Sequence, residues 1–138
     1  MTVTALDHVL VLSDDVDAAR DFYCAALGLE AGERPPFDFA GHWLYAAGER
    51  PVIHLADRAE YEAHVRRRGL EWPASEHAID HVAFAAVDLA AAAERLQRAG
   101  ITARSSAVPG GSLRQLFFTA PEGLRIELNA IDQRAGAG

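Results

Sequence analysis

Three histidines and one glutamate stand at repeated positions in this chain of 138 residues. The 46 positions that separate His8 from His54 also separate His81 from Glu127. Imidazole and carboxylate groups are common ligands of divalent transition metals. A single histidine in an apolar strand is usually a hydrogen-bonded, partly buried residue. A duplicated set of four instead favours one metal site built from two half-sites.

The ligand types restrict the metal but do not select one ion. An all-oxygen calcium site does not fit three imidazoles, and one cysteine cannot form a thiolate cluster. Fe(II), Zn, Ni, Mn and Co all remain candidates. Four protein ligands leave open positions on a six-coordinate ion for water or a bidentate substrate, which a catalytic metal requires.

Each candidate ligand lies in a short apolar run that is typical of a β-strand. The runs are Leu6–Leu10, Val52–Leu55, Ile79–Ala83 and Leu124–Leu128. Alternate residues of a strand share a face, and the residues on either side of each candidate ligand are mostly apolar. We therefore expect helices to cover the apolar face and the ligands to share the uncovered one, where a curled sheet would form a cup.

The repeat extends beyond the ligands at a constant offset of 73 positions, which carries His8 onto His81. Both halves continue with a helical pattern that begins after an aspartate and stops at a glycine, Gly28 or Gly100. Further on, His42–Ala47 aligns without a gap with Gln115–Ala120, ahead of a turn. Each half is thus predicted to be a strand, a helix and three further strands, the last two joined as a hairpin, in an α+β fold.

These patterns predict one domain over residues 1–138. Its first module covers 4–55 and its second covers 79–130, with a connector at 56–78 that holds a helix over Asp57–Arg68. The polar tail at 131–138 is predicted to be disordered.

Composition excludes several classes of function. The net charge is −7 and all 13 basic residues are arginine, which argues against a nucleic-acid partner. Cys24 is the single cysteine, so no disulfide framework exists, and its role stays open. The N-terminal residues show neither a signal peptide nor a membrane span, so we expect a cytoplasmic protein with no membrane partner.

The sequence resembles the vicinal oxygen chelate superfamily, also called the glyoxalase, bleomycin resistance protein and dioxygenase superfamily. The resemblance covers roughly residues 4–130, and its motifs are specific for the superfamily but not for one reaction. The matching segments are Leu6–Val9, Asp17–Tyr23, Leu27–Leu29, Ile79–Phe84 and Phe117–Leu128.

This resemblance implies two βαβββ modules that form an eight-stranded cup around a metal. The first strands would supply His8 and His81, and the fourth strands His54 and Glu127. Members often form homodimers and exchange modules between chains. In a glyoxalase-like lyase or isomerase the metal would chelate oxygens of a small metabolite through an enediolate-like intermediate, with Glu127 moving the proton. Glyoxalase I has a glutamate where this chain has His54.

The resemblance leaves three other functions open. The main alternative is an Fe(II)-dependent extradiol-type dioxygenase, in which His42 and Tyr45 would act as acid and base. A thiol transferase of the fosfomycin-resistance type fits less well, because the chain has no lysine. A bleomycin-sequestering binding protein would generally lack the ligand set. The predicted substrate-binding residues in all these cases are Arg114, Gln115, Phe117 and Arg125.

Overall fold

The computed structural model of the chain describes residues 6–67, 81–107 and 112–131. It shows two compact units, each centred on one half of the sequence. The elements of the first half are β1 (Val9–Ser13), α1 (Val16–Leu27), β2 (Glu30–Gly32), β3 (Gly41–Tyr45), β4 (Pro51–Asp57) and α2 (Arg58–Arg67). Those of the second half are β5 (His81–Ala85), α3 (Leu89–Arg98), β6 (Arg104–Ala107), β7 (Leu113–Thr119) and β8 (Arg125–Ile131).

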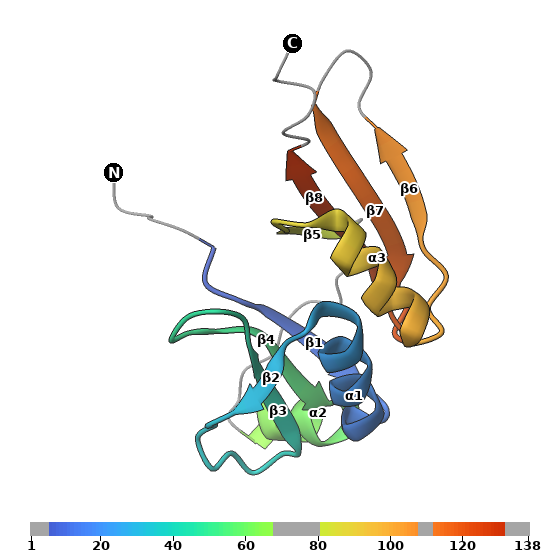
Figure 1. The fold of residues 1–138 in the computed structure, drawn as a ribbon. Coiled ribbons are helices and arrows are strands. Elements are labelled where there is room, and N and C mark those ends of the chain that lie inside the picture. The colour runs from blue at the N-terminus through green and yellow to red at the C-terminus, as the bar shows by residue number, and fades with distance from the viewer. Residues whose placement is uncertain (1–5, 68–80, 108–111, 132–138) are drawn as a thin grey trace. The chain divides into compact units, whose positions relative to one another are not determined.

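The two sheets share one topology (Figure 1). Their strand orders are β1-β4-β3-β2 and β5-β8-β7-β6. In each sheet the first and fourth strands of the module pair in parallel, and the remaining pairs are antiparallel. The predicted α+β class and the two tandem βαβββ modules are confirmed. Closure of the sheets into one cup and the single-domain boundaries stay predictions.

Local sequence signals set the ends of both module helices. Asp15 and Asp88 are the N-caps of α1 and α3, and their carboxylates accept hydrogen bonds from Ala18 N and Ala91 N at 3.0 Å. At the other ends Gly28 and Gly100 have φ values of 70° and 72°, in the left-handed region that favours glycine. The predicted helices are therefore confirmed.

The core of each unit lies on one face of its sheet. Leu44, Ile53 and Leu55 are fully buried in the first unit, as Ile126 is in the second. On β4 and β8 these buried residues alternate with the candidate ligands His54 and Glu127. Burial of the apolar side chains on one face of the sheet therefore directs His54 and Glu127 to the opposite face. This agrees with the alternation expected from the sequence.

The predicted connector helix is present as α2, from Arg58 to Arg67. The remainder of the predicted connector, from residue 68 to residue 78, lies outside the described residues, as does all of the predicted disordered tail except Ile131, which ends β8. Within the part of the chain that the structure describes, no helix has the length and apolarity needed to cross a membrane.

The gapless alignment of the two hairpins is wrong by one residue. Trp43 pairs with His54 in the first sheet, but the residue that pairs with Glu127 in the second is Phe117, not Leu116. A register shift between Leu44 and Tyr45 marks an irregularity that the second hairpin lacks over its described pairs. Successive residues of a strand point to opposite faces of the sheet. A shift of one position therefore means that residues aligned between the two hairpins, such as Trp43 and Leu116, point to opposite faces of their sheets.

Replacement of Asp88 by alanine should lower the free energy of unfolding by about 1 kcal/mol, because the amide of Ala91 loses its acceptor. Asp88→Asn keeps a side-chain oxygen and should cost much less. Urea unfolding of the two variants measures the difference, and equal losses would contradict the capping role.

Candidate functional site

His8 and His54 form the first candidate half-site. The parallel register pairs Leu10 with His54, and His8, two residues before Leu10, approaches the same face. The two imidazole rings stack with their centroids 3.7 Å apart and their planes 11° apart. His54 also stacks on Trp43 of β3, with a centroid distance of 4.2 Å. The three rings form a column that runs from the residue before β1 to β4 and β3.

The Nε2 atom of His54 is buried and finds no hydrogen-bond partner among the described residues. Burial lowers the pKa of His54 to about 4, and the charge of His8 contributes to the shift. The imidazole is therefore neutral at physiological pH, which is the form that binds metal ions. A buried nitrogen without a hydrogen-bond partner lowers the stability of the fold unless a bound ligand supplies the missing interaction.

A carboxylate orients the other imidazole. Asp7 Oδ2 lies 2.7 Å from His8 Nδ1, and Arg50 Nη1 donates to Asp7 Oδ1 at 3.0 Å. The hydrogen bond from His8, with help from Arg50, lowers the pKa of Asp7. A carboxylate on Nδ1 holds the proton there and leaves Nε2 available, an arrangement common among metal-binding histidines.

The stacked arrangement of the two rings is not itself a chelate. Nitrogen lone pairs lie in the ring plane, and two nearly parallel planes do not converge on a single ion. One of the two rings has to turn before both can bind the same metal. His8 is the more exposed of the pair, with 36% of its side chain accessible, so its rotation disturbs less packing.

His81 and Glu127 form the second candidate half-site. The register pairs Ala83 with Glu127, so His81 shares its face. His81 Nε2 lies 3.1 Å from Glu127 Oε2, and Gln115 Nε2 donates to Glu127 Oε1 at 2.7 Å. Glu127 is only 7% exposed, so both carboxylate oxygens are held by neighbours in a largely dehydrated setting.

The predicted substrate-binding residues divide between the two faces of the second sheet. Gln115, Phe117 and Arg125 share the face of Glu127, because their register partners are Asn129, Glu127 and His81. Arg114 points to the opposite face together with the buried Leu116. The structure thus brings three of the four to the carboxylate and leaves Arg114 away from it.

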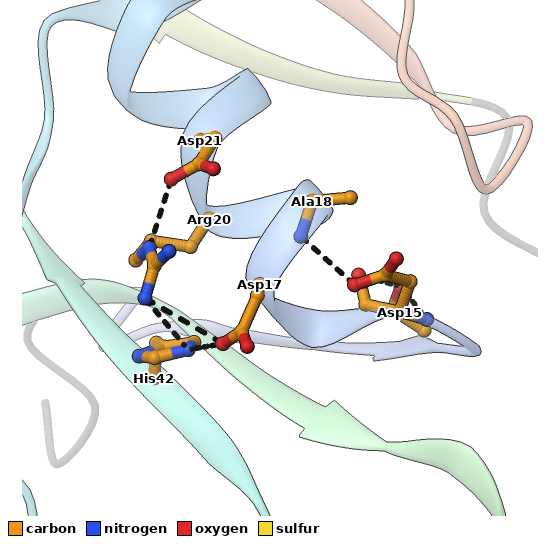
Figure 2. A network of polar contacts seen from close by, with 7 residues as sticks. Asp15, Asp17, Ala18, Arg20, Asp21 and His42 are labelled. Carbon is orange, nitrogen blue, oxygen red and sulfur yellow. Dashed lines mark hydrogen bonds and ion pairs between the residues drawn. The ribbon is translucent and has the colours of Figure 1, made fainter.

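His42 lies on the helix side of the first sheet, since its register partner is the buried Leu55 rather than His54. Its Nε2 atom lies 2.7 Å from Asp17 Oδ1 of α1, and Figure 2 shows Arg20 beside the pair. The hydrogen bond from His42 lowers the pKa of Asp17. His42 therefore lies away from His54, its contacts join α1 to β3, and its catalytic role stays a prediction.

Tyr45 is the other predicted acid-base residue. Its hydroxyl donates to the backbone carbonyl oxygen of Glu33 at 2.7 Å. The phenolic hydrogen is therefore committed to a backbone group, and Tyr45 does not line the pocket beside His8 and His54.

Sequence reasoning missed the aromatic side chains around the first half-site. A pocket of about 220 Å³ beside His8 and His54 is lined by Phe37, Phe39, Trp43, Tyr61 and His64, among others. The concentration of aromatic residues between 37 and 45 was the available signal. No sequence pattern indicated that Tyr61 and His64 of α2 would line the pocket, because the connector that contains them has no counterpart in the repeat.

The donor set fits a divalent transition metal. Among the described residues no three His, Cys, Asp or Glu side chains gather into one metal-holding group, so each unit offers a pair. The buried and unpaired Nε2 of His54 is the observation that favours a metal, because a bound ion would complete its coordination.

The free energy of unfolding of the metal-free protein should fall as pH drops from about 6.5 to 4. In this window His54 becomes protonated in the unfolded chain but stays neutral in the folded one. His54→Phe keeps a stacking ring without the titration and should lose less stability over this window. Urea unfolding with a chelator present measures both proteins. Parallel pH curves for the two would contradict the assignment.

Comparisons with known proteins agree with this fold. Residues 5–128 match the model of the family described as Glyoxalase/Bleomycin resistance protein/Dioxygenase superfamily. A search of curated proteins finds no match.

Solved structures with similar folds include a protein assigned to the glyoxalase family from Bacillus anthracis, with 21% identity, a TM-score of 0.69 and coverage of 95% of this chain and 98% of that one. The lactoylglutathione lyase of Agrobacterium tumefaciens has 21% identity and a TM-score of 0.66, with 94% and 95% covered. TnmS3, an antibiotic binding protein from a Streptomyces species, has 21% identity and a TM-score of 0.67, with 95% and 98% covered. At such identity these likenesses show the fold alone, whereas the family match over most of the sequence shows that the chain belongs to the Glyoxalase/Bleomycin resistance protein/Dioxygenase superfamily.

Proposed function

We propose that the protein is a divalent-metal-dependent enzyme of the lyase or isomerase type, acting on a small metabolite with two neighbouring oxygens. His8, His54, His81 and Glu127 would hold the metal, either within one chain or across a homodimer. The observation that supports this proposal is the duplicated register: because Leu10 lies opposite His54 and Ala83 opposite Glu127, the two candidate ligands of each module share one face of its sheet.

The four ligands differ in what they can contribute. His54 is neutral and its Nε2 has no partner among the residues that the structure describes, and the contact of His8 with Asp7 favours a tautomer with Nε2 free. In the second unit, Glu127 and His81 are paired with each other at 3.1 Å, so metal binding would replace an existing contact. When bound, the metal would act as a Lewis acid that polarises a substrate carbonyl and acidifies the neighbouring carbon.

Glu127 is the carboxylate placed to take a proton from that carbon and return it. Its carboxylate is buried, and the amide of Gln115 fixes its orientation through Oε1. Gln115 in turn donates to Asn129 Oδ1 at 3.2 Å, so the amide is anchored on both sides. We assign Gln115 the role of a positioning residue.

Ring cleavage by an Fe(II)-dependent dioxygenase is the second candidate function, and the aromatic pocket beside His8 and His54 favours it. The placements of His42 and Tyr45 weigh against it, because His42 lies on the helix side of the sheet and the hydroxyl of Tyr45 donates to the backbone carbonyl of Glu33. Simple small-molecule binding, as in the antibiotic-binding neighbour, is a further candidate, and the complete ligand set weighs against it.

Purified protein should bind about one divalent metal ion per site, and His8→Ala, His54→Ala, His81→Ala and Glu127→Ala should each weaken that binding by at least about 10-fold. His42→Ala removes an imidazole away from the ligand face and should leave metal content unchanged. Elemental analysis and competition with a chelator measure both. Equal metal content in all variants would contradict the ligand assignment.

The reaction class is tested by two assays on the same preparation. Methylglyoxal with a thiol under Ni(II) or Zn(II) should be turned over, and Glu127→Gln should lower the rate by about 100-fold or more, because it removes the base. Catechols under Fe(II) should give no oxygen uptake. Oxygen uptake without turnover in the first assay would overturn the lyase or isomerase proposal in favour of ring cleavage.

A further inference from the structure

The pocket beside His8 and His54 is walled largely by aromatic rings. Its volume of about 220 Å³ lies entirely among described residues of the first half of the chain. None of its lining residues carries a carboxylate or a guanidinium group. A pocket of this composition favours an uncharged, apolar group over a charged peptide-like tail.

The rings of this pocket form a connected series that begins at the candidate ligands. His54 stacks on Trp43, whose ring centroid is 6.2 Å from that of Phe37. Phe37 stacks on Phe39 at 5.0 Å, and Phe39 meets Tyr61 edge to face at 5.2 Å. The series presents both ring faces and ring edges, which are the two geometries in which aromatic groups attract each other.

Polar contacts behind the rings hold this wall in place. Asp38, between Phe37 and Phe39, pairs with His64 and accepts a hydrogen bond from Arg67 Nη2 at 2.7 Å. The guanidinium of Arg34 lies 5.1 Å and 5.0 Å from the ring centroids of Phe37 and Phe39. It also donates to the carbonyl oxygen of Phe39 at 2.6 Å. A wall fixed before binding loses little conformational freedom when a ligand enters.

We propose that this pocket holds an aromatic ring of the substrate, beside the metal that the proposed function places at His8 and His54. The inference rests on that function and names its substrate class: a single ring attached to a pair of neighbouring oxygens. An apolar cavity of about 150 Å³ holds benzene in another protein. The larger volume here accommodates one ring with a small substituent.

Mandelate and lactate form a matched pair of probes for this proposal, since they share a hydroxyl-carboxylate pair and differ by a phenyl ring in place of a methyl group. With Zn(II) present, mandelate should bind the full-length protein at least about 10-fold more tightly than lactate. Hexahydromandelate, which has the bulk without the aromatic ring, should bind more weakly than mandelate. Calorimetry measures all three dissociation constants.

Two substitutions of Tyr61, one that removes the ring and one that keeps it, test the ring preference. Tyr61→Ala should reduce the preference for mandelate about 5-fold and leave lactate binding unchanged, whereas Tyr61→Phe keeps the ring and should keep the preference. Equal affinities for mandelate and lactate in the Zn(II)-loaded wild-type protein would overturn the proposal.

A probe without the oxygen pair separates the pocket from the metal. Benzyl alcohol should bind saturably to the chelator-treated protein and change the fluorescence of Trp43, read in a Trp72→Phe background. This change should be lost in Tyr61→Ala. If benzyl alcohol binds but no probe depends on Zn(II), the ring pocket stands and the proposed metal function falls. Zn(II)-dependent binding with no ring preference would instead support the metal site and overturn the ring pocket.

Discussion

The parallel pairing of the first and fourth strands of each module is the constraint on which the rest of this structure depends. It aligns Val9 with Ile53 and Val82 with Ile126, so the same register occurs in both halves of the chain. Ile53 and Ile126 are almost wholly buried, and a slip of one residue would expose them and bury their polar neighbours. Burial of these isoleucines thus fixes the direction of His54 and Glu127, and the energy that folds each module also orients its candidate ligands.

The sequence repeat predicted much of this arrangement, for reasons that particular residues make clear. The aspartate caps and the glycines at 28 and 100 are local signals, so the helices could be placed before any tertiary contact was known. The hairpins were misaligned because an irregular register between Leu44 and Tyr45 leaves no trace in the residue types. A difference of one position was enough to hide the pairing of Phe117 with Glu127.

The two half-sites have diverged further than their shared register suggests. Around His54 the neighbours are rings, and α2 adds Tyr61 and His64 from a segment that has no equivalent in the repeat. Around Glu127 lie the amide of Gln115, which also bonds Asn129, the imidazole of His81, and Phe117, its partner in the sheet register. Duplication thus preserved the backbone framework while the side chains diverged: stacked rings surround His54, whereas hydrogen-bonding groups hold both oxygens of Glu127. Comparison of the halves could predict the shared framework, but not the surroundings unique to each.

This difference also explains why His54 is tolerated where a carboxylate would be costly. A glutamate among stacked rings would place a charge in an apolar environment without a hydrogen-bonding partner such as Gln115. An imidazole avoids that penalty by remaining neutral, as its lowered pKa indicates, and its flat ring extends the aromatic column. The remaining cost is one buried nitrogen that has no hydrogen-bond partner within the described part of the chain. A side chain kept at such a cost, at a position that the backbone repeat matches to a carboxylate, is best explained by a ligand that completes it.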